Sequence, residues 1–280
     1  MMTNRVLACV AFVAAAQPLA AQISTDVTDK AQAAAFAISS TPVGALPWLV
    51  TPHSLGTAKG TGLRFQAGNI DEAGDFSRRI VLGGIDFPVG RSTIGISAGY
   101  LDFACGNDAA GPGIEIDCKG GLMAGARAGT SLVSAPVGTG STTSFLVGID
   151  GSVGFGTGDV LELTFDDGFG NQGTGKFEGT SMALGLSLPV ALVARGAGVT
   201  VAPHFTPGVG YGRLTAKVSA SGGGFTDSSE DSESGARFML GGGAAILFTN
   251  SGLGLHLGFQ KVFVKDGEAT LALGLSYTMR

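Results

Sequence analysis

The last stretch of the chain, residues 269–279, alternates strictly between two kinds of side chain. The side chains of one face are Ala269, Leu271, Leu273, Leu275, Tyr277 and Met279, and those of the other are Thr270, Ala272, Gly274, Ser276 and Thr278. One face is therefore apolar and the other is small or weakly polar. A strand of about 9 to 11 residues with this pattern is typical of a tilted strand in a membrane-spanning barrel. The pattern predicts lipid on one face and a lumen on the other.

The same two-residue period returns along the chain after Gly60. The alternating segments are 63–68, 81–87, 94–100, 122–129, 145–156, 182–188, 199–211, 237–248, 253–260 and 269–279. They are longer than the strands of about 5 to 6 residues that a soluble β-sandwich would show. We therefore predict an all-β protein, an antiparallel up-and-down transmembrane β-barrel of about ten strands, with 8 or 12 as alternatives. The first strand should pair with the last.

Two of these segments carry further predictions. The phase of 145–156 continues through Leu161, Leu163 and Phe165, which predicts a hairpin that projects above the membrane. Segment 199–211 contains Pro203 and Pro207, each of which removes a backbone donor, so β-bulges are expected there.

The connections alternate in length around the predicted barrel. If the chain enters from the periplasm, the turns at 88–92, 134–142, 189–198 and 249–252 lie on that side. The other side receives 71–77, the loop between the cysteines, the 166–171 tip, the acidic stretch 227–234 and 265–268. Short turns on one side and mostly longer, charged loops on the other are typical of bacterial outer-membrane barrels.

Composition excludes two classes of protein. Charged residues make up 14% of the 280 residues and 48 are glycine, while the sequence pI is about 5.1. Disorder requires low hydrophobicity with high net charge, and 44% of this chain is hydrophobic. Nucleic-acid binding requires a basic surface, which an acidic pI does not favour.

The beginning of the chain predicts export. Arg5, the apolar run 6–16 and the small residues before Gln22 form the three regions of a signal peptide, with cleavage after Ala21, or after Ala16 as an alternative. Cys9 raises the alternative of a lipoprotein site, but it lies at the start of the apolar run. We divide the chain into a signal peptide at 1–21, an N-terminal periplasmic arm or plug at 22–60, and a transmembrane β-barrel at 61–280.

Two cysteines remain after the predicted cleavage, Cys105 and Cys118. In an exported protein, two cysteines that close a short Gly/Pro-containing loop predict a disulfide, worth roughly 3 kcal/mol in the chain-entropy model. A metal site would need more ligands than this pair offers, and we expect no metal and no cofactor.

The inward face is where function must reside, and it is dominated by glycine, alanine and serine. The larger polar residues expected to line the lumen are Arg64, Gln66, Asp86, Arg127, Asp150, His204, Arg237, His256 and Gln260. One interpretation is that these charges pair across the interior, because an unpaired buried charge is costly. The other is that they line a solute pathway. For the two histidines, hydrogen bonding inside the lumen is favoured over a metal site that lacks a third ligand.

A catalytic interpretation is weaker. Asp166, Asp167 and Ser229 belong to predicted outer loops, but no histidine is expected near them to act as a base. The Ser/Asp/Glu stretch 226–234 lacks the ligand spacing of a calcium loop. We therefore expect no enzymatic activity and identify no catalytic residue.

The signal peptide and residues 62–280 resemble a bacterial outer-membrane β-barrel protein, the class that includes porins and small OmpA-like barrels. Members usually end in an alternating apolar strand with a final aromatic residue, which resembles a recognition signal for the barrel-insertion machinery. Here Met279 and Arg280 take the place of that residue. The resemblance implies an outer-membrane location, contact with outer-membrane lipid and recognition by that machinery. The leading functional hypothesis is a narrow pore or small-ligand-binding barrel for solute passage; the alternative is a non-conducting structural or surface-interaction barrel.

Overall fold

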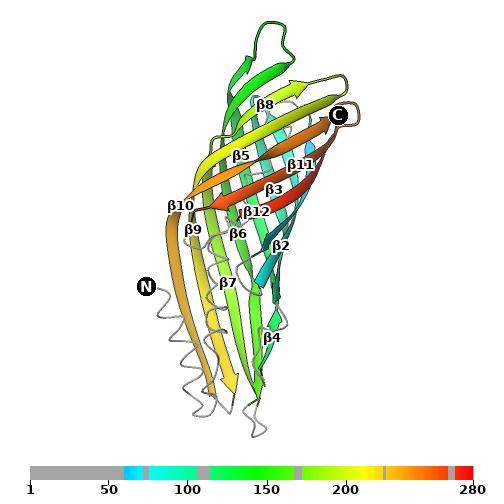
Figure 1. The fold of residues 1–280 in the computed structure, drawn as a ribbon. Helices are drawn as coiled ribbons and strands as arrows, with labels where there is room; N and C mark the ends of the chain where they lie inside the picture. Colours follow the sequence, from blue (N-terminus) through cyan, green and yellow to red (C-terminus); the bar gives the residue numbers. More distant parts are fainter. Residues whose placement is uncertain are drawn as a thin grey trace.

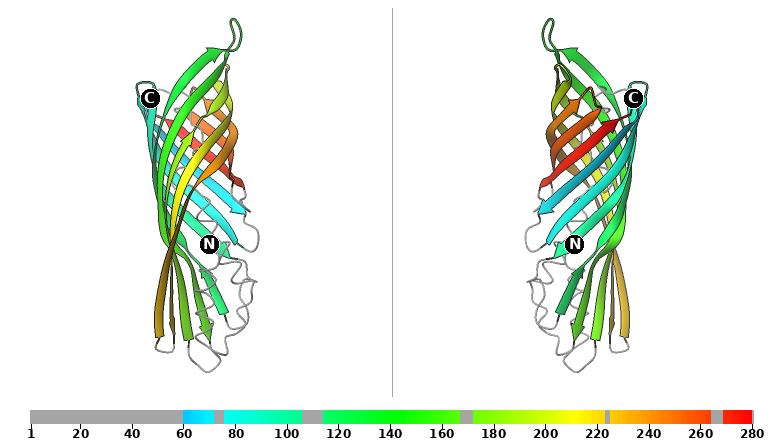
Figure 2. Two further views of the ribbon diagram at one scale, coloured as in Figure 1. Left: turned by 90° about the vertical axis from the view of Figure 1, so that its left-hand side faces the viewer. Right: turned by 90° about the vertical axis from the view of Figure 1, so that its right-hand side faces the viewer.

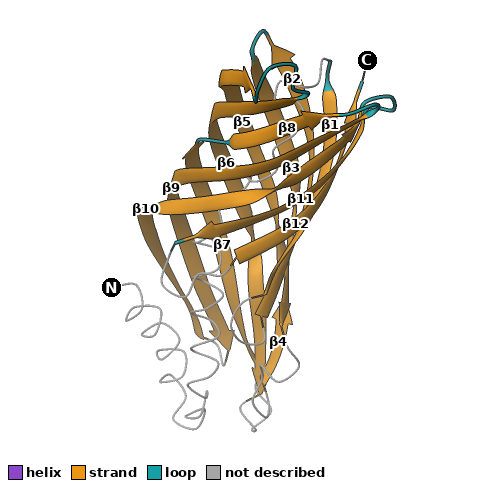
Figure 3. Ribbon diagram, turned by 45° about the horizontal axis from the view of Figure 1, so that its top comes forward, coloured by secondary structure: helices purple, strands orange, loops and turns teal. Residues whose placement is uncertain are grey.

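The computed structural model of the protein describes residues 60–71, 76–105, 114–166, 172–222, 225–263 and 269–279. The predicted signal peptide and almost all of the predicted N-terminal arm or plug lie outside these residues, so both stay predictions. The regular elements of the described part are strands joined by loops (Figure 3). Within the described residues, no helix is long and apolar enough to cross a membrane.

The chain forms twelve strand segments, which run in order along the sequence. They are β1 (Gly62–Asp71), β2 (Phe76–Val89), β3 (Ser92–Cys105), β4 (Ile114–Cys118), β5 (Gly120–Pro136), β6 (Thr143–Asp166), β7 (Gln172–Ser187), β8 (Val190–Arg195), β9 (Val199–Gly222), β10 (Phe225–Phe248), β11 (Leu253–Val262) and β12 (Ala269–Thr278).

These segments close into the predicted ten-stranded barrel. Consecutive strands pair antiparallel around the ring, and β12 pairs with both β11 and β1, so that Gly62 lies opposite Thr278. Two strands of the barrel are each split into two segments: β4 and β5 both pair with β6, while β7 and β8 both pair with β9. The closed antiparallel barrel of ten strands confirms the fold prediction.

Each split has a local cause. Between β4 and β5, the Lys119 amide donates to the carbonyl of Val160, at the place where β6 holds one extra residue between Asp159 and Leu161. This β-bulge reverses the inward and outward phase beyond it. Leu161 is consequently buried, and the prediction that the outward phase continues through Leu161 is wrong.

The prolines of β9 are accommodated differently from the prediction. Pro207 lies where β9 changes partner from β8 to β7, and its carbonyl accepts from the Leu188 amide at 2.9 Å. Pro207 therefore lacks its backbone N–H donor at a place where the neighbouring strand is interrupted. The registers of β9 with β7 and β10 run without a shift, so the predicted bulge is not found in them.

Two expected connections are in fact strands. The acidic stretch 227–234 pairs with β9 as part of β10, with Glu230 opposite Lys217, because β9 continues far enough to offer a partner. The predicted turn 189–198 contains β8, which pairs with β6 and β9. Strand pairing therefore extends further than the polarity of these stretches indicated.

The barrel is much taller on one side. At the end away from Thr278, β4 and the outer parts of β6, β7, β9 and β10 continue beyond the remaining strands as a curved sheet (Figures 1 and 2). We call this the projecting sheet and define it by residues 114–118, 157–166, 172–181, 212–222 and 225–237. It confirms the expectation of a projecting hairpin and adds β4, β9 and β10 to it.

The two faces of the wall differ as the sequence predicts. On β12, Leu271 and Leu273 are 62% and 65% exposed, whereas Ala272 between them is 3% exposed. Exposed aromatic residues on one rim are Phe87, Phe145, Phe248 and Tyr277, and those nearer the projecting sheet are Tyr100, Phe155, Tyr211, Phe238 and Phe263. An apolar band between two aromatic rims is the surface that a bilayer requires.

Candidate functional site in the barrel lumen

The nine polar residues assigned to the lumen come from seven strands. Arg64 and Gln66 lie on β1, Asp86 on β2, Arg127 on β5, Asp150 on β6, His204 on β9, Arg237 on β10, and His256 and Gln260 on β11. All except Arg237 are buried. Their positions alternate with exposed apolar residues along each strand, so the burial places them on the inner face of the wall.

Three of the charges form a buried ion-pair cluster. Asp86 is 1% exposed and accepts from Nη2 of Arg127 at 2.9 Å. Its other oxygen lies 3.6 Å from Nε of Arg64. Asp150 carries the fourth charge and lies close enough to Arg127 and Arg64 to interact electrostatically with both. The four residues balance in charge, as the low dielectric of a barrel interior demands.

Inward glycines provide the space for this cluster. A Cβ at Gly84 would lie 2.7 Å from Nε of Arg64, and one at Gly95 would meet both the Asp86 carboxylate and Nε of Arg127. A Cβ at Gly129 would lie 3.1 Å from Cγ of Asp150. The small residues of the inner face therefore make room for charged side chains from neighbouring strands.

The histidines take up different positions around the ring. His256 Nε2 lies 2.8 Å from the hydroxyl of Ser276 on β12, and both side chains are buried. His204 lies on β9, with Nδ1 3.5 Å from the carbonyl of Ala202. Among the described residues, no three His, Cys, Asp or Glu side chains are grouped to hold a metal.

The registers bring most of these residues to one height. Barrel strands tilt by about 35–45° to the barrel axis. A plane perpendicular to that axis therefore crosses each successive strand about one residue away from the residue that pairs with the previous crossing point. From Arg64 this plane passes near Asp86 and Arg127 in one direction and near Ser276 and His256 in the other. Asp150 and His204 fall at the same level on the far wall. We call this set the polar layer; it lies close to the rim where β1 begins.

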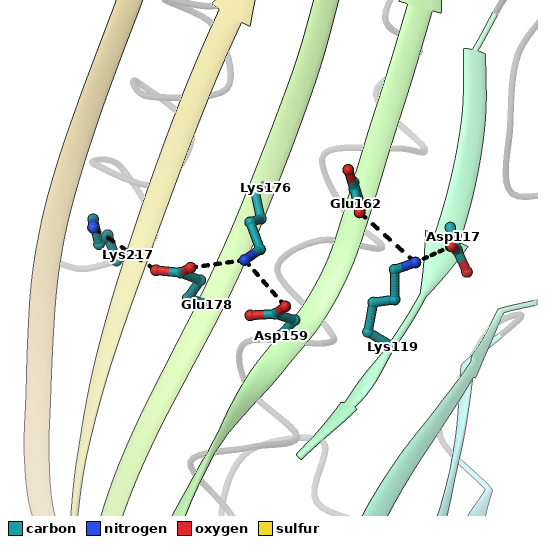
Figure 4. A network of polar contacts seen from close by, with 7 residues as sticks. All are labelled: Asp117, Lys119, Asp159, Glu162, Lys176, Glu178 and Lys217. Carbon is teal, nitrogen blue, oxygen red and sulfur yellow. Dashed lines mark hydrogen bonds and ion pairs between the residues drawn. The ribbon is translucent and has the colours of Figure 1, made fainter.

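The outer wall of the projecting sheet carries a second charged group, which sequence reasoning missed. Figure 4 shows Asp117, Lys119, Asp159, Glu162, Lys176, Glu178 and Lys217 across β4, β6, β7 and β9. We call these residues the ionic belt. Lys176 contacts Glu178 at 3.0 Å and Asp159 at 3.1 Å, and Lys217 reaches the other oxygen of Glu178 at 3.8 Å. Lys119 bridges Asp117 and Glu162 in the same way.

The belt identifies where lipid ends. Hydrogen bonding to Glu178 and Asp159 raises the pKa of Lys176, and hydrogen bonding to Asp117 raises the pKa of Lys119. These ions are substantially exposed, and charged side chains on a lipid-facing wall would be costly. The projecting sheet therefore stands outside the hydrocarbon. The sequence signal for the ionic belt was that Lys176 and Glu178 lie two residues apart on one strand. Their partners on neighbouring strands depend on how those strands are aligned in register.

The remaining candidates are only partly described. Cys105 ends β3 and Cys118 ends β4, and their pairing with one another stays a prediction. Asp166 ends β6, and Asp167 lies outside the described residues. Ser229, expected in a loop, lies in β10 opposite Val218 and is exposed.

No protein-family model matches the sequence, and no curated protein matches it. Among solved structures, the translocator domain of the autotransporter NalP from Neisseria meningitidis is 12% identical, with a TM-score of 0.38 over 91% of this chain and 97% of that one. The transport unit of AIDA-I from Escherichia coli is 10% identical, with a TM-score of 0.36 over 91% and 99%. LpxR from Salmonella typhimurium is 12% identical, with a TM-score of 0.36 over 78% and 100%.

Likenesses of this degree carry no information about function. The location follows from the surface of the closed barrel. Its outward residues are apolar between two aromatic rims, and only a bilayer removes such a surface from water. The chain is a membrane-spanning β-barrel, with its strands closed around a polar layer and one side extended beyond the hydrocarbon.

Proposed function

We propose that the protein is a non-conducting outer-membrane barrel that acts at the cell surface through its projecting sheet. The observation that carries the proposal is the burial of the inward side chains over the full length of β11 and β12. The lining of an open channel is wetted, whereas Gln260, Ala272 and Ser276 are 3–5% exposed. Pairing of Asp86 with two arginines further supports a closed lumen.

The projecting sheet supports the surface role. Among the described residues, β9 is the one strand that pairs with residues 225–237 of β10, so the other edge of this stretch has no strand partner among them. Open edges invite pairing with other chains, and charges are one protection that natural proteins use. Asp227 and Glu230 lie on this edge strand. A sheet that is held by ion pairs, charged along its edge and raised above the membrane is suited to contact with soluble or surface partners.

Conductance tests the proposal directly. Purified full-length protein in a planar bilayer should be silent, and stable channel openings would contradict the closed barrel. Orientation is tested with Lys217→Cys on the projecting sheet and Arg91→Cys in the turn after β2, using a membrane-impermeant thiol reagent on intact cells. Lys217→Cys should be labelled at once, and Arg91→Cys only after the outer membrane is permeabilised. The reverse result would place the projecting sheet in the periplasm.

A narrow pore for small solutes is the second candidate, and one observation favours it. Within the described residues, several buried inward atoms lack a hydrogen-bond partner, among them Nε of Arg64, Oε1 of Gln66 and Oδ1 of Asp150. Polar atoms of this kind suit a lumen that admits water or a polar solute. Conductance with ion selectivity that changes in an Asp150→Asn variant would support this candidate against the closed barrel.

The route to the membrane completes the proposal. We infer export by the signal peptide 1–21, recognition of the β12 strand by the insertion machinery, and a disulfide between Cys105 and Cys118. Cys105 ends β3 and Cys118 ends β4, and these two strands are in contact with each other. Oxidised and reduced samples of the mature protein should differ by two thiols in alkylation and mass spectrometry. Two free thiols in protein isolated from cells would contradict the disulfide.

A further inference from the structure

The outer face of β7, β9 and β10 changes in steps from the apolar band to the ionic belt. Strand pairing sets its side chains in rows across the three strands. In order away from the hydrocarbon, the rows are Leu186, Val209 and Phe238; Leu184, Tyr211 and Ala236; Met182, Arg213 and Ser234; the pair Thr180 and Thr215; and Glu178, Lys217 and Glu230. Arg213 therefore lies in the first polar row above the lipid-facing residues.

The charge of Arg213 is not balanced by the side chains beside it. Arg213 is exposed, and the residues opposite it on the two neighbouring strands are Met182 and Ser234. On this face of the three strands, the described acidic side chains are those of Glu178 and Glu230. Both lie opposite Lys217, four residues or about 13 Å further along β9, and Glu178 contacts Lys217 at 3.8 Å (Figure 4). Among the described side chains of this face, Arg213 thus has no carboxylate within reach.

Hydroxyl groups complete the surroundings of this guanidinium. Ser234 lies directly opposite Arg213, Thr215 is the next outward residue on β9, and Thr180 pairs with Thr215. Direct and diagonal neighbours on one face of a sheet lie about 5 Å and 7–8 Å apart, which is within reach of an arginine side chain. A planar guanidinium with hydroxyl donors around it is suited to bind the oxygens of a phosphate group.

We propose that Arg213 binds the phosphate of a membrane-lipid headgroup. The position of the site favours a lipid over a soluble anion. Met182 and Tyr211, which adjoin Arg213, are 45% and 44% exposed on the lipid-facing wall, so the acyl chains of the bound lipid extend along them. Aromatic and basic side chains meet the headgroups at this boundary, where the phosphates are the negative charges closest to the apolar band.

A headgroup bound at Arg213 ties the base of the projecting sheet to the membrane surface. The outer face then has two charged levels with separate partners, because Lys176 and Lys217 are already balanced by carboxylates of the ionic belt. The inference goes beyond the proposed surface role, since it names a lipid ligand. It holds whether or not the lumen conducts and on whichever side of the membrane the projecting sheet lies.

Two lipids with the same acyl chains test the role of the phosphate. Full-length protein in a neutral detergent is titrated with dioleoyl phosphatidic acid or with dioleoylglycerol, which lacks the phosphate, and native mass spectrometry measures the fraction of lipid-bound protein. The wild type should bind phosphatidic acid more tightly than dioleoylglycerol. Arg213→Gln should weaken the binding of phosphatidic acid about fivefold, the effect of one cation near a membrane surface, and leave that of dioleoylglycerol unchanged. Arg213→Lys keeps the charge and should retain most of the affinity.

Lys217→Gln is the matched control, because it removes the same charge from the same face of β9 at a position paired with Glu178. At about 13 Å from Arg213, beyond the Debye length of about 10 Å in 0.1 M salt, it should change the affinity less than about twofold. An equal loss in the two variants, or no loss in Arg213→Gln, would overturn the inference.

Folding and the source of the phosphate are checked separately. Every variant is first required to change its gel mobility on boiling, the mark of an intact barrel. If Arg213→Gln does not fold, the wild type decides, since equal affinity for the two lipids would contradict the phosphate site. Potassium phosphate should displace phosphatidic acid no better than potassium chloride at the same ionic strength. Stronger displacement by phosphate would assign Arg213 to a soluble anion and so overturn the lipid site.

Discussion

Removing the carboxylate of Asp86 should destabilise the barrel more than any other single loss of charge in the lumen. The side chain is 1% exposed, contacts Nη2 of Arg127 at 2.9 Å and lies 3.6 Å from Nε of Arg64. Asp86→Asn keeps the shape of the side chain and removes its charge. Two arginines are then left facing one another with only Asp150 to balance them.

The size of the effect follows from these distances. Unit charges 3–4 Å apart interact by about 4–6 kcal/mol at an effective dielectric constant of 20. Part of this is already offset by desolvation, and loss of one partner from a buried pair costs about 3–5 kcal/mol. For a protein of this size that corresponds to a fall of about 6–20 °C in the midpoint of unfolding. Loss of the folded, fast-migrating gel band with temperature measures this midpoint in detergent.

A double-mutant cycle separates charge pairing from packing. Arg127→Gln together with Asp86→Asn leaves Arg64 and Asp150 as one balanced pair, so the double variant should lose less stability than the sum of the single variants. Glu230→Gln on the exposed edge of β10 makes the same change in net charge and should move the midpoint little. A single Asp86→Asn variant as stable as the wild type, or a double variant that loses the full sum, would refute the reasoning.

Three further changes test other parts of the barrel. Gly99→Ala would press a methyl group against a backbone carbonyl of the next strand and should cost about 1–3 kcal/mol in urea unfolding, whereas Gly83→Ala, on the outer face with its nearest atom 4.0 Å away, should be neutral. Leu273→Lys places a charge on the lipid face of β12 and should cost about 2–4 kcal/mol in vesicles; a cost near zero would argue against lipid there. Because the pKa of Lys176 is raised, its ion pairs persist at neutral pH and are lost as the pH rises through the folded pKa. At pH 9–10 its amine should be acylated more slowly than in Glu178→Gln, as read by peptide mass spectrometry, and equal rates would contradict the hydrogen bond.

The alternation of the sequence was sufficient to predict the wall. A strand has a side-chain period of two, so Leu273 and Ala272 were assigned to opposite faces from their positions alone, and the same rule gave the ten-stranded count. The inward positions of Arg64 and Asp86 followed from that rule as well. Outward apolar residues require lipid whatever the details of pairing, which is why the membrane location could also be predicted.

Pairing, in contrast, was decided by the tertiary structure. The extra residue at Val160 reverses the phase of β6, and nothing in an alternating sequence marks where a neighbouring strand will be interrupted. Residues 227–234 are polar enough for a loop, yet they form a strand because β9 extends beside them. A strand exists where a partner offers its backbone, and the partner is set by contacts far away in the sequence.

The polar layer illustrates the same division. The sequence alone determined which residues face inward, because that depends only on odd or even position within a strand. It could not determine that Arg64, Asp86 and Arg127 meet, since their heights depend on the stagger between strands around the closed ring. The closure of the barrel fixes that stagger, and with it the charge pairing at the level where the lumen begins.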